Sequence, residues 1–114
     1  MLKIGKFYEN KALVFLMNNG LKLIKKNYYC CFGEIDLIMK DGNILVFIEV
    51  RYRKSSKYSD PIESIDGSKQ KKLLKSAAQY LKRYNLFDKI DCRFDVIGIS
   101  DNKLNWIKDA FSYE

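Results

Sequence analysis

The chain has 114 residues, of which 47% are hydrophobic and 31% are charged, ordinary values for a globular protein. A chain of this length is expected to fold as one domain, residues 1–114, around its own hydrophobic core. It contains no histidine, and its 21 Lys and Arg against 14 Asp and Glu give a net charge of +7. The absence of histidine excludes Ser-His-Asp and Cys-His catalysis and any zinc site that needs histidine.

Cysteine usage and hydropathy indicate the cellular compartment in which the protein is expected. The three cysteines, Cys30, Cys31 and Cys92, include no CxxC pair, and an odd number does not fit a disulfide framework. The longest uninterrupted apolar runs, 12–17 and 44–48, are too short to cross a membrane, and no signal-peptide pattern precedes the first helix. We therefore expect a cytoplasmic protein without a membrane segment.

The first half of the chain has the pattern of a helix followed by strands. Helical periodicity extends over 5–19 and Gly20 is a natural stop. Strands are predicted over 21–31 and 33–40, and the tripeptide Asp41-Gly42-Asn43 is a strong hairpin signal. The sequence therefore predicts a helix and then a hairpin that leads into a further strand.

The second half continues with a crossover. A strand over 44–53 is apolar on both faces at first, which is typical of a central strand. After it comes a loop of about thirteen residues, long enough to act as a functional flap. The remaining predicted elements are a helix over 67–84, a strand over 91–100 and a short strand over 104–107. The order is α-β-β-β-α-β-β, an α/β mixed sheet flanked by helices, with 44–53 and 91–100 joined by a right-handed parallel crossover.

The positive charge is concentrated in one part of the chain. Residues 51–83 hold ten basic and three acidic residues, which accounts for the whole net charge of +7. A segregated basic region indicates a polyanionic partner, nucleic acid first and an anionic membrane second. The alternative is a lysine-rich helix whose charged face is simply solvated.

Acidic residues occupy positions where apolar ones are expected. Helical periodicity places Glu9 on the face of Ala12, Leu13 and Leu16. An acid at the edge of a helix, near its positive N-terminus, would also account for Glu9 without any function.

The strand over 44–53 changes character along one face. Leu45 and Phe47 are followed on that face by Glu49, Arg51 and Arg53. Such a change fits a site that opens at the C-terminal end of the strand, where α/β sheets commonly bind ligands.

Whether Asp36 and Glu49 meet depends on the hairpin loop. A two-residue Asp41-Gly42 turn would place Asp36 opposite Phe47 with Glu49 as its diagonal neighbour, and a four-residue loop would place Asp36 opposite Glu49. A three-residue loop would put the two acids on opposite faces. We expect the two-residue turn and two converging carboxylates, which suit a hard cation such as Mg²⁺. A structural ion-pair network with the arginines is the alternative.

The helix over 67–84 adds two polar residues to this region. Gln70 falls within its apolar arc, and Lys69 lies at the edge of that arc. Both are in the first turn, so they are expected to point toward the sheet near the site. A snorkelling lysine in a frayed first turn is the alternative.

These residues carry a family resemblance. The runs Gly33-Glu34-Ile35-Asp36, Ile48-Glu49-Val50-Arg51 and Ser68-Lys69-Gln70, together with Arg93-Phe94-Asp95-Val96 and the ending Trp106-Ile107-Lys108, are similar to the YraN family of uncharacterised bacterial proteins. That family resembles the restriction-endonuclease-like superfamily with the PD-(D/E)xK signature, and within it the archaeal Holliday-junction resolvases. The superfamily core is α-β-β-β-α-β, in agreement with the order above.

The resemblance implies roles for several residues. Asp36 and Glu49 match the two acids of the signature and would hold Mg²⁺ or Mn²⁺, with the Val50 carbonyl as a further ligand. Glu9 matches the first-helix glutamate of resolvase-like members. Arg51 stands where the signature has lysine, and Arg51 or Lys69 would stabilise the phosphate charge. Glu34 and Gln70 would support the ligands, and nucleic acid, DNA in particular, would be held by Arg53, Lys54, Lys57, Lys72 and Lys75.

Three classes of function follow from these observations. The first is a metal-dependent DNA endonuclease that acts on branched or processed DNA, and resolvases of that kind are usually homodimers. The second is a nucleic-acid-binding protein whose nuclease site has decayed, because arginine cannot practically act as a base. The third is a protein-interaction module.

Overall fold

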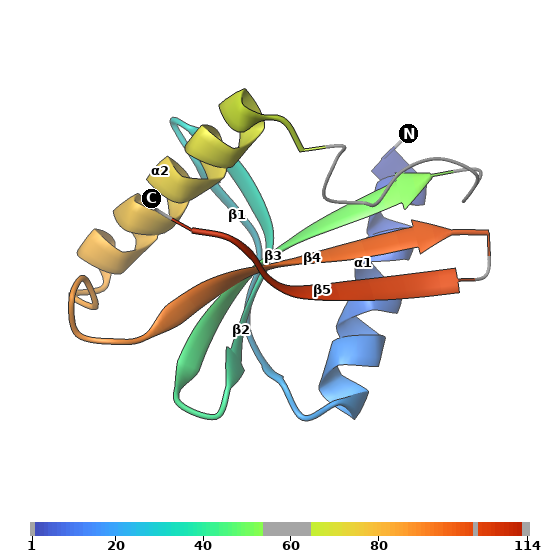
Figure 1. The fold of residues 1–114 in the computed structure, drawn as a ribbon, viewed down its shortest axis with the longest axis horizontal. Coiled ribbons are helices and arrows are strands. Elements are labelled where there is room, and N and C mark those ends of the chain that lie inside the picture. The colour runs from blue at the N-terminus through green and yellow to red at the C-terminus, as the bar shows by residue number, and fades with distance from the viewer. Residues whose placement is uncertain (1, 54–64, 102, 113–114) are drawn as a thin grey trace.

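The computed structural model describes residues 2–53, 65–101 and 103–112, with the backbone alone for residues 2–4. The predicted order of elements is confirmed (Figure 1). The predicted loop over 54–66 falls for the most part outside the described residues. The elements are α1 (Leu2–Asn18), β1 (Lys22–Cys30), β2 (Gly33–Asp41), β3 (Ile44–Arg53), α2 (Gly67–Arg83), β4 (Cys92–Ser100) and β5 (Lys103–Phe111).

The strands form one five-stranded mixed sheet in the order β1-β2-β3-β4-β5. The central pair β3 and β4 is parallel and the other three pairs are antiparallel. The crossover through α2 therefore joins parallel strands, as predicted. None of the described helices is long and apolar enough to cross a membrane.

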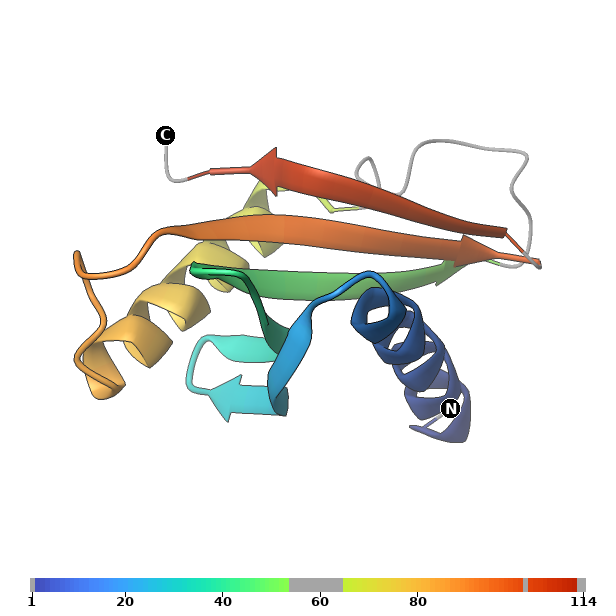
Figure 2. The same cartoon turned by 90° about the horizontal axis from the view of Figure 1, so that it is seen from below.

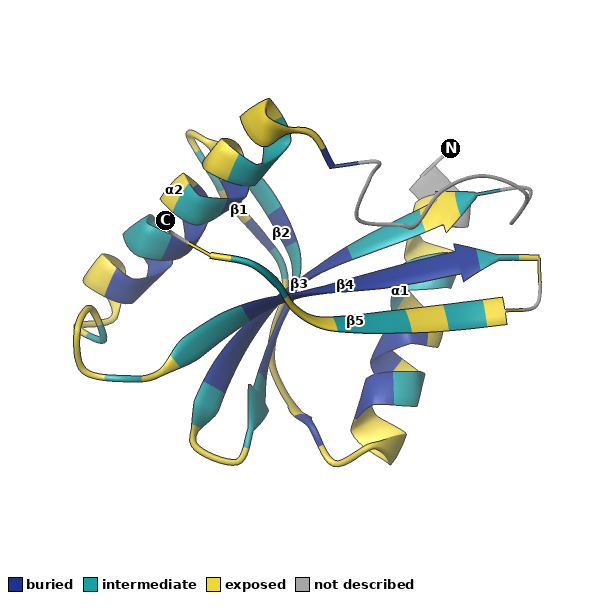
Figure 3. Ribbon diagram, in the orientation of Figure 1, coloured by how far each residue is buried: buried dark blue, intermediate teal, exposed yellow. Residues whose placement is uncertain are grey.

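The two helices lie toward opposite ends of the molecule (Figure 2), and each packs against a separate core cluster on its own face of the sheet. Alternation along β3 shows this, because Phe47 packs in the cluster beneath α2 whereas Val46 and Ile48 pack in the cluster beneath α1. Strands β3 and β4 are buried on both faces over most of their length (Figure 3). These two strands therefore form the rigid centre that positions everything else.

The side chains of β2 on either side of Asp36 pack against different helices. Ile35 packs in the cluster with α2, but Leu37, two residues later, packs in the cluster with α1. Residues two apart in a flat strand share a face, so β2 must be strongly twisted here. Asp36 lies at the point of this twist, between Ile35 and Leu37.

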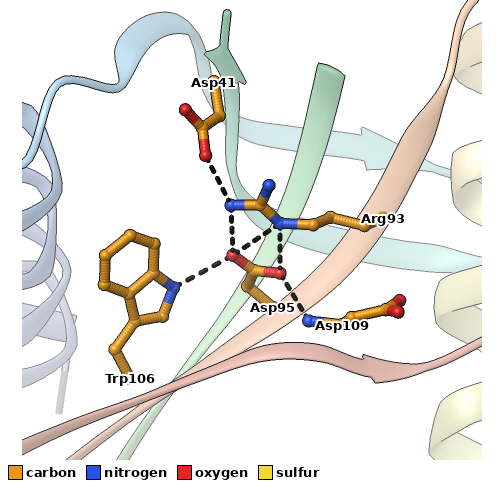
Figure 4. A network of polar contacts seen from close by, with 5 residues as sticks. All are labelled: Asp41, Arg93, Asp95, Trp106 and Asp109. Carbon is orange, nitrogen blue, oxygen red and sulfur yellow. Dashed lines mark hydrogen bonds and ion pairs between the residues drawn. The ribbon is translucent and has the colours of Figure 1, made fainter.

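The last strand is longer than the predicted 104–107. A buried carboxylate, Asp95, explains the difference (Figure 4). It accepts hydrogen bonds from the Asp109 backbone N–H (3.0 Å) and Trp106 Nε1 (2.9 Å), which hold β5 against β4. It also pairs with Arg93, whose second nitrogen contacts Asp41 Oδ2 at 2.9 Å. The C-terminal part of this strand could not be predicted from sequence patterns, because the residues near Asp109 are polar and exposed. They are held in the strand by tertiary interactions.

Candidate metal and nucleic-acid site

Two acids converge at the middle of the sheet, although by a different turn from the one predicted. Asp41 pairs with Ile44, so the two-residue loop is Gly42-Asn43 and not Asp41-Gly42. The register continues to Leu37 opposite Ile48, which makes Asp36 and Glu49 the next facing positions. The two acids still share a face, because moving a two-residue loop by one position shifts the register by two residues and preserves the face.

The contacts of Asp36 fix it beside Glu49. The backbone N–H of Val50, the residue after Glu49, donates to Asp36 Oδ2 at 2.8 Å. Glu49 is only 7% exposed. The two carboxyl groups therefore lie near each other in a largely buried place.

Burial is the main cause of the unusual proton affinity of this pair. Desolvation, followed by the negative charge of Glu49, raises the pKa of Asp36 to about 9, against the smaller lowering effect of the Val50 N–H. Desolvation also raises the pKa of Glu49, while Lys69 and Arg51 oppose the rise. Such a pair holds a proton at neutral pH and would exchange it for a cation.

Two basic side chains lie on the Glu49 side of the pair. Arg51 Nε is 3.3 Å from Glu49 Oε2, and Lys69 Nζ is 3.8 Å from the same oxygen. Lys69 reaches this position from the first turn of α2, where the N-cap Asp66 accepts from the Lys69 backbone N–H at 2.8 Å. The expectation that Lys69 points toward the site is therefore confirmed.

Two further acids lie on the other side of Asp36. Carboxylate oxygens of Glu9, Glu34 and Asp36 all lie within 4.8 Å of one another. Asn27 holds two of them, because its Nδ2 donates to Glu9 Oε1 at 2.9 Å and to Glu34 Oε2 at 2.7 Å. Helix α1 thus contributes Glu9 to a group of acids from β2, as its position beside Ala12 and Leu16 suggested.

Sequence reasoning missed Asn27. Its backbone φ is 54°, in the left-handed region that Asn tolerates better than most residues. The residues on either side of it pair with Leu37 and Ile35, which places Asn27 opposite Asp36. An Asn among the lysines and tyrosines of a predicted strand is the only signal that the sequence offers.

An aromatic contact fixes α1 beside β3. The rings of Tyr8 and Tyr52 stack with centroids 3.9 Å apart and an interplanar angle of 13°. Because Tyr8 directly precedes Glu9, this contact sets where that carboxylate lies along the sheet. No sequence pattern pointed to the pairing, since it joins residues far apart in the chain.

The remaining predicted site residues are more dispersed. The Gln70 side-chain amide donates to the Ile65 carbonyl oxygen at 3.0 Å. Lys72 and Lys75 are exposed on α2, and Lys75 Nζ lies 5.8 Å from the centre of the Phe32 ring. Arg53 ends β3 on the face that carries Arg51. The predicted contacts of Lys54 and Lys57 lie outside the described residues.

The class of protein follows from the order of the elements and the place of the acids. This is a small α/β domain whose elements begin with the order α-β-β-β-α-β, and its two buried acids, Asp36 and Glu49, lie on the neighbouring strands β2 and β3. Residues 8–99 match the model of the uncharacterised protein family UPF0102, and the chain belongs to that family, the YraN family of the predicted resemblance.

Relatives extend the match to nearly the whole chain. A UPF0102 protein of Coxiella burnetii (strain RSA 331 / Henzerling II) is 47% identical over 98% of this chain and 94% of its own length. One from Legionella pneumophila (strain Corby) is 47% identical over 94% and 92%. One from Psychromonas ingrahamii is 50% identical over 94% and 88%.

Proposed function

We propose that this protein binds nucleic acid and hydrolyses its phosphodiester bonds with a divalent metal ion, Mg²⁺ or Mn²⁺, held by Asp36 and Glu49. The observation that carries the proposal is the convergence of acids from α1, β2 and β3 beside two basic side chains. Such an arrangement places oxygen ligands and phosphate-binding groups side by side, which phosphoryl chemistry requires.

The donor set fits a hard divalent cation. Mg²⁺ and Mn²⁺ take carboxylate oxygens and keep several waters. Asp36 and Glu49 would be the ligands and Glu9 an outer ligand, with Asn27 orienting Glu9 and Glu34. The fit is supported by the raised pKa of Asp36, because a cation there would relieve the repulsion between neighbouring carboxylates. When bound, the ion would polarise the scissile phosphate and lower the pKa of the attacking water.

Arg51 and Lys69 would bind the phosphate rather than move a proton. Both are basic side chains and both lie within 4 Å of Glu49 Oε2, at 3.3 and 3.8 Å. Arg51 replaces the signature lysine as an electrostatic group, since its guanidinium can hydrogen-bond phosphoryl oxygens. Lys69, which comes from α2, would supply the ammonium that Arg51 lacks.

Nucleic acid is the proposed polyanion because the basic residues are concentrated in the part of the chain that supplies Arg51 and Lys69. The net charge of +7 resides in residues 51–83, which contribute Arg51 and Lys69 to the site itself. The same charge also favours a second function, a nucleic-acid-binding module without catalysis, because Arg51 departs from the signature. Symmetrical cutting of branched DNA would further require a homodimer.

The proposal is tested by incubating the protein with a four-way DNA junction and with a linear duplex, in Mg²⁺, in Mn²⁺ and in EDTA. The variants are Asp36→Asn and Glu49→Gln. Asp88→Asn, an identical change at an exposed acid between α2 and β4, is the matched control. Metal-dependent cutting that both site variants lose and the control keeps is the expected result.

Two other outcomes would change the assignment. Binding of DNA without cutting, unaltered by the site variants, would favour the non-catalytic module. Failure to bind DNA even at low salt would overturn both functions and favour a protein-interaction module, for which pull-down partners would then be sought.

A further inference from the structure

A cavity of about 420 Å³ lies at the C-terminal ends of the parallel strands β3 and β4, next to the acidic site. Its lining comes from β3, from β4 and from the start of β5. The polar positions lie on the face of the sheet that α2 covers elsewhere. They are Arg51, Arg53, Ser100, Lys103 and Asn105, with Gly98 in the floor.

The charged side chains that line this cavity, among the described residues, are all positive. Arg51, Arg53 and Lys103 line it, and none of its described lining residues is acidic. Asp101, in the same turn as Lys103, instead acts electrostatically on Tyr8 of α1. Among the described residues, neither Arg53 nor Lys103 forms an ion pair. Cations that face a shared hollow without partners favour an anionic ligand.

Arg51 connects the cavity to the acidic site. It lines the cavity and also lies 3.3 Å from Glu49 Oε2. Its Nε is buried, and no hydrogen-bond acceptor for this nitrogen exists among the described residues. Arg51 is therefore the side chain through which the cavity and the acidic site adjoin.

We propose that this cavity, which we call the β3–β5 groove, binds the sugar–phosphate backbone of a nucleic-acid strand, next to the phosphate that the proposed function places at Arg51 and Lys69. This inference rests on the proposed function and adds to it the path of the strand, including two residues of β5 that no sequence pattern singled out. Arg53 and Lys103 bind phosphate, and Ser100 and Asn105 donate neutral hydrogen bonds.

The groove reads the backbone and not the bases. Its described lining contains no aromatic side chain on which a base could stack, and its apolar members are aliphatic, Ile99 and Leu104. Stacking on aromatic side chains is the usual way in which proteins hold unpaired bases. Binding through this groove is therefore independent of sequence and strongly dependent on salt.

The test is fluorescence anisotropy of labelled single-stranded and duplex DNA, in EDTA so that no cutting interferes, over a series of salt concentrations. Lys103→Glu is compared with Lys25→Glu, since both lysines are exposed on edge strands, β5 and β1 respectively. Arg53→Ala is the second groove variant, and circular dichroism checks that each variant is folded.

Weaker binding by both groove variants, but not by Lys25→Glu, is the expected result. The slope of log Kd against log salt should also fall by about 0.7 to 0.9 for each phosphate that the variant no longer neutralises.

Groove variants that bind DNA as tightly as the Lys25→Glu control would overturn the groove and leave the proposed function standing, provided that the wild-type protein binds DNA. A wild-type protein that binds no DNA would overturn both. If the groove variants lose the same affinity for two DNA molecules of unrelated sequence, the result supports recognition of the backbone. A loss of affinity for only one of the two sequences would overturn that recognition mode.

Discussion

Asp36 and Glu49 directly adjoin the paired residues Leu37 and Ile48 of β2 and β3, so two acids come together in a largely buried place. Burial raises the pKa of both groups, the charge of Glu49 raises that of Asp36 further, and Lys69 and Arg51 offset only part of the rise at Glu49. A protein gains nothing in stability from placing two acids together in this way. The proposed divalent cation would offset this unfavourable pairing of acids.

The stability of the metal-free protein should fall as pH rises. An unfolded Asp titrates near pH 4, whereas folded Asp36 has a pKa of about 9, so the folded state holds the extra proton between these values. The unfolding free energy therefore decreases from about pH 4 to about pH 9. Asp36→Asn stays neutral and should exceed the wild type at pH 9 by at least ~1 kcal/mol. Urea unfolding in EDTA at pH 5 and pH 9 measures the difference, and an equal pH dependence in both proteins would contradict the prediction.

Divalent cations should raise the melting temperature, and more so at high pH. Metal binding requires the Asp36 and Glu49 pair to release its proton, so the effect of Mn²⁺ should be larger at pH 8.5 than at pH 6. Glu49→Gln should reduce the shift and Asp88→Asn should not. Differential scanning fluorimetry with and without EDTA provides the measurement. A shift of the same size in Glu49→Gln would place the cation elsewhere.

Arg51→Lys should keep DNA cleavage and Arg51→Ala should lose most of it. Lysine matches the signature and retains the positive charge near Glu49, whereas alanine removes the charge and the donors. We expect a loss of about 100-fold for Arg51→Ala, typical of removing one electrostatic contact to a transition state. Single-turnover cleavage rates distinguish this effect from weaker binding. Full activity in Arg51→Ala would indicate that Lys69 stabilises the phosphate charge instead, and the Lys69→Ala variant would test this directly.

Asp95→Ala should destabilise the protein without any direct effect on the acidic site. The substitution removes the buried carboxylate from Arg93, which keeps only its contact with Asp41 among the described residues, and it leaves the N–H groups of Trp106 and Asp109 without their acceptor. Breaking a buried charged pair typically costs about 3–5 kcal/mol. Asp91→Ala, at an exposed acid just before β4, is the control in urea unfolding. A change below about 1 kcal/mol would show that the Asp95 network is dispensable.

Much of the fold was predictable because local patterns and global packing agree. The apolar stripe of α1, the alternation in β2 and the hydrophobic run of β3 each match the element that forms. The length of β5 was not predictable, since Asp95 of β4 supplies the acceptor that orders Asp109. The hairpin loop was predicted one residue too early because Asp-Gly and Gly-Asn are both good two-residue turns.

Some residues of the candidate site could also be predicted from the sequence, and others could not. Glu9, Asp36, Glu49 and Lys69 were visible in the sequence because each is a charged residue at a position where its periodicity predicts an apolar one or the edge of an apolar face. Asn27, which lies opposite Asp36, gave no such signal. The same is true of Lys103, which reaches the groove only because β5 pairs with β4.

The order of the elements, the face on which each acid lies and the excess of positive charge follow from periodicity and composition, so they can be predicted from the amino-acid sequence alone. Which groups meet depends instead on how the elements pack together. The twist of β2 at Asp36, the stacking of Tyr8 on Tyr52 and the pairing of β5 with β4 join segments distant in the chain. Such contacts depend on packing in three dimensions, which no local pattern encodes.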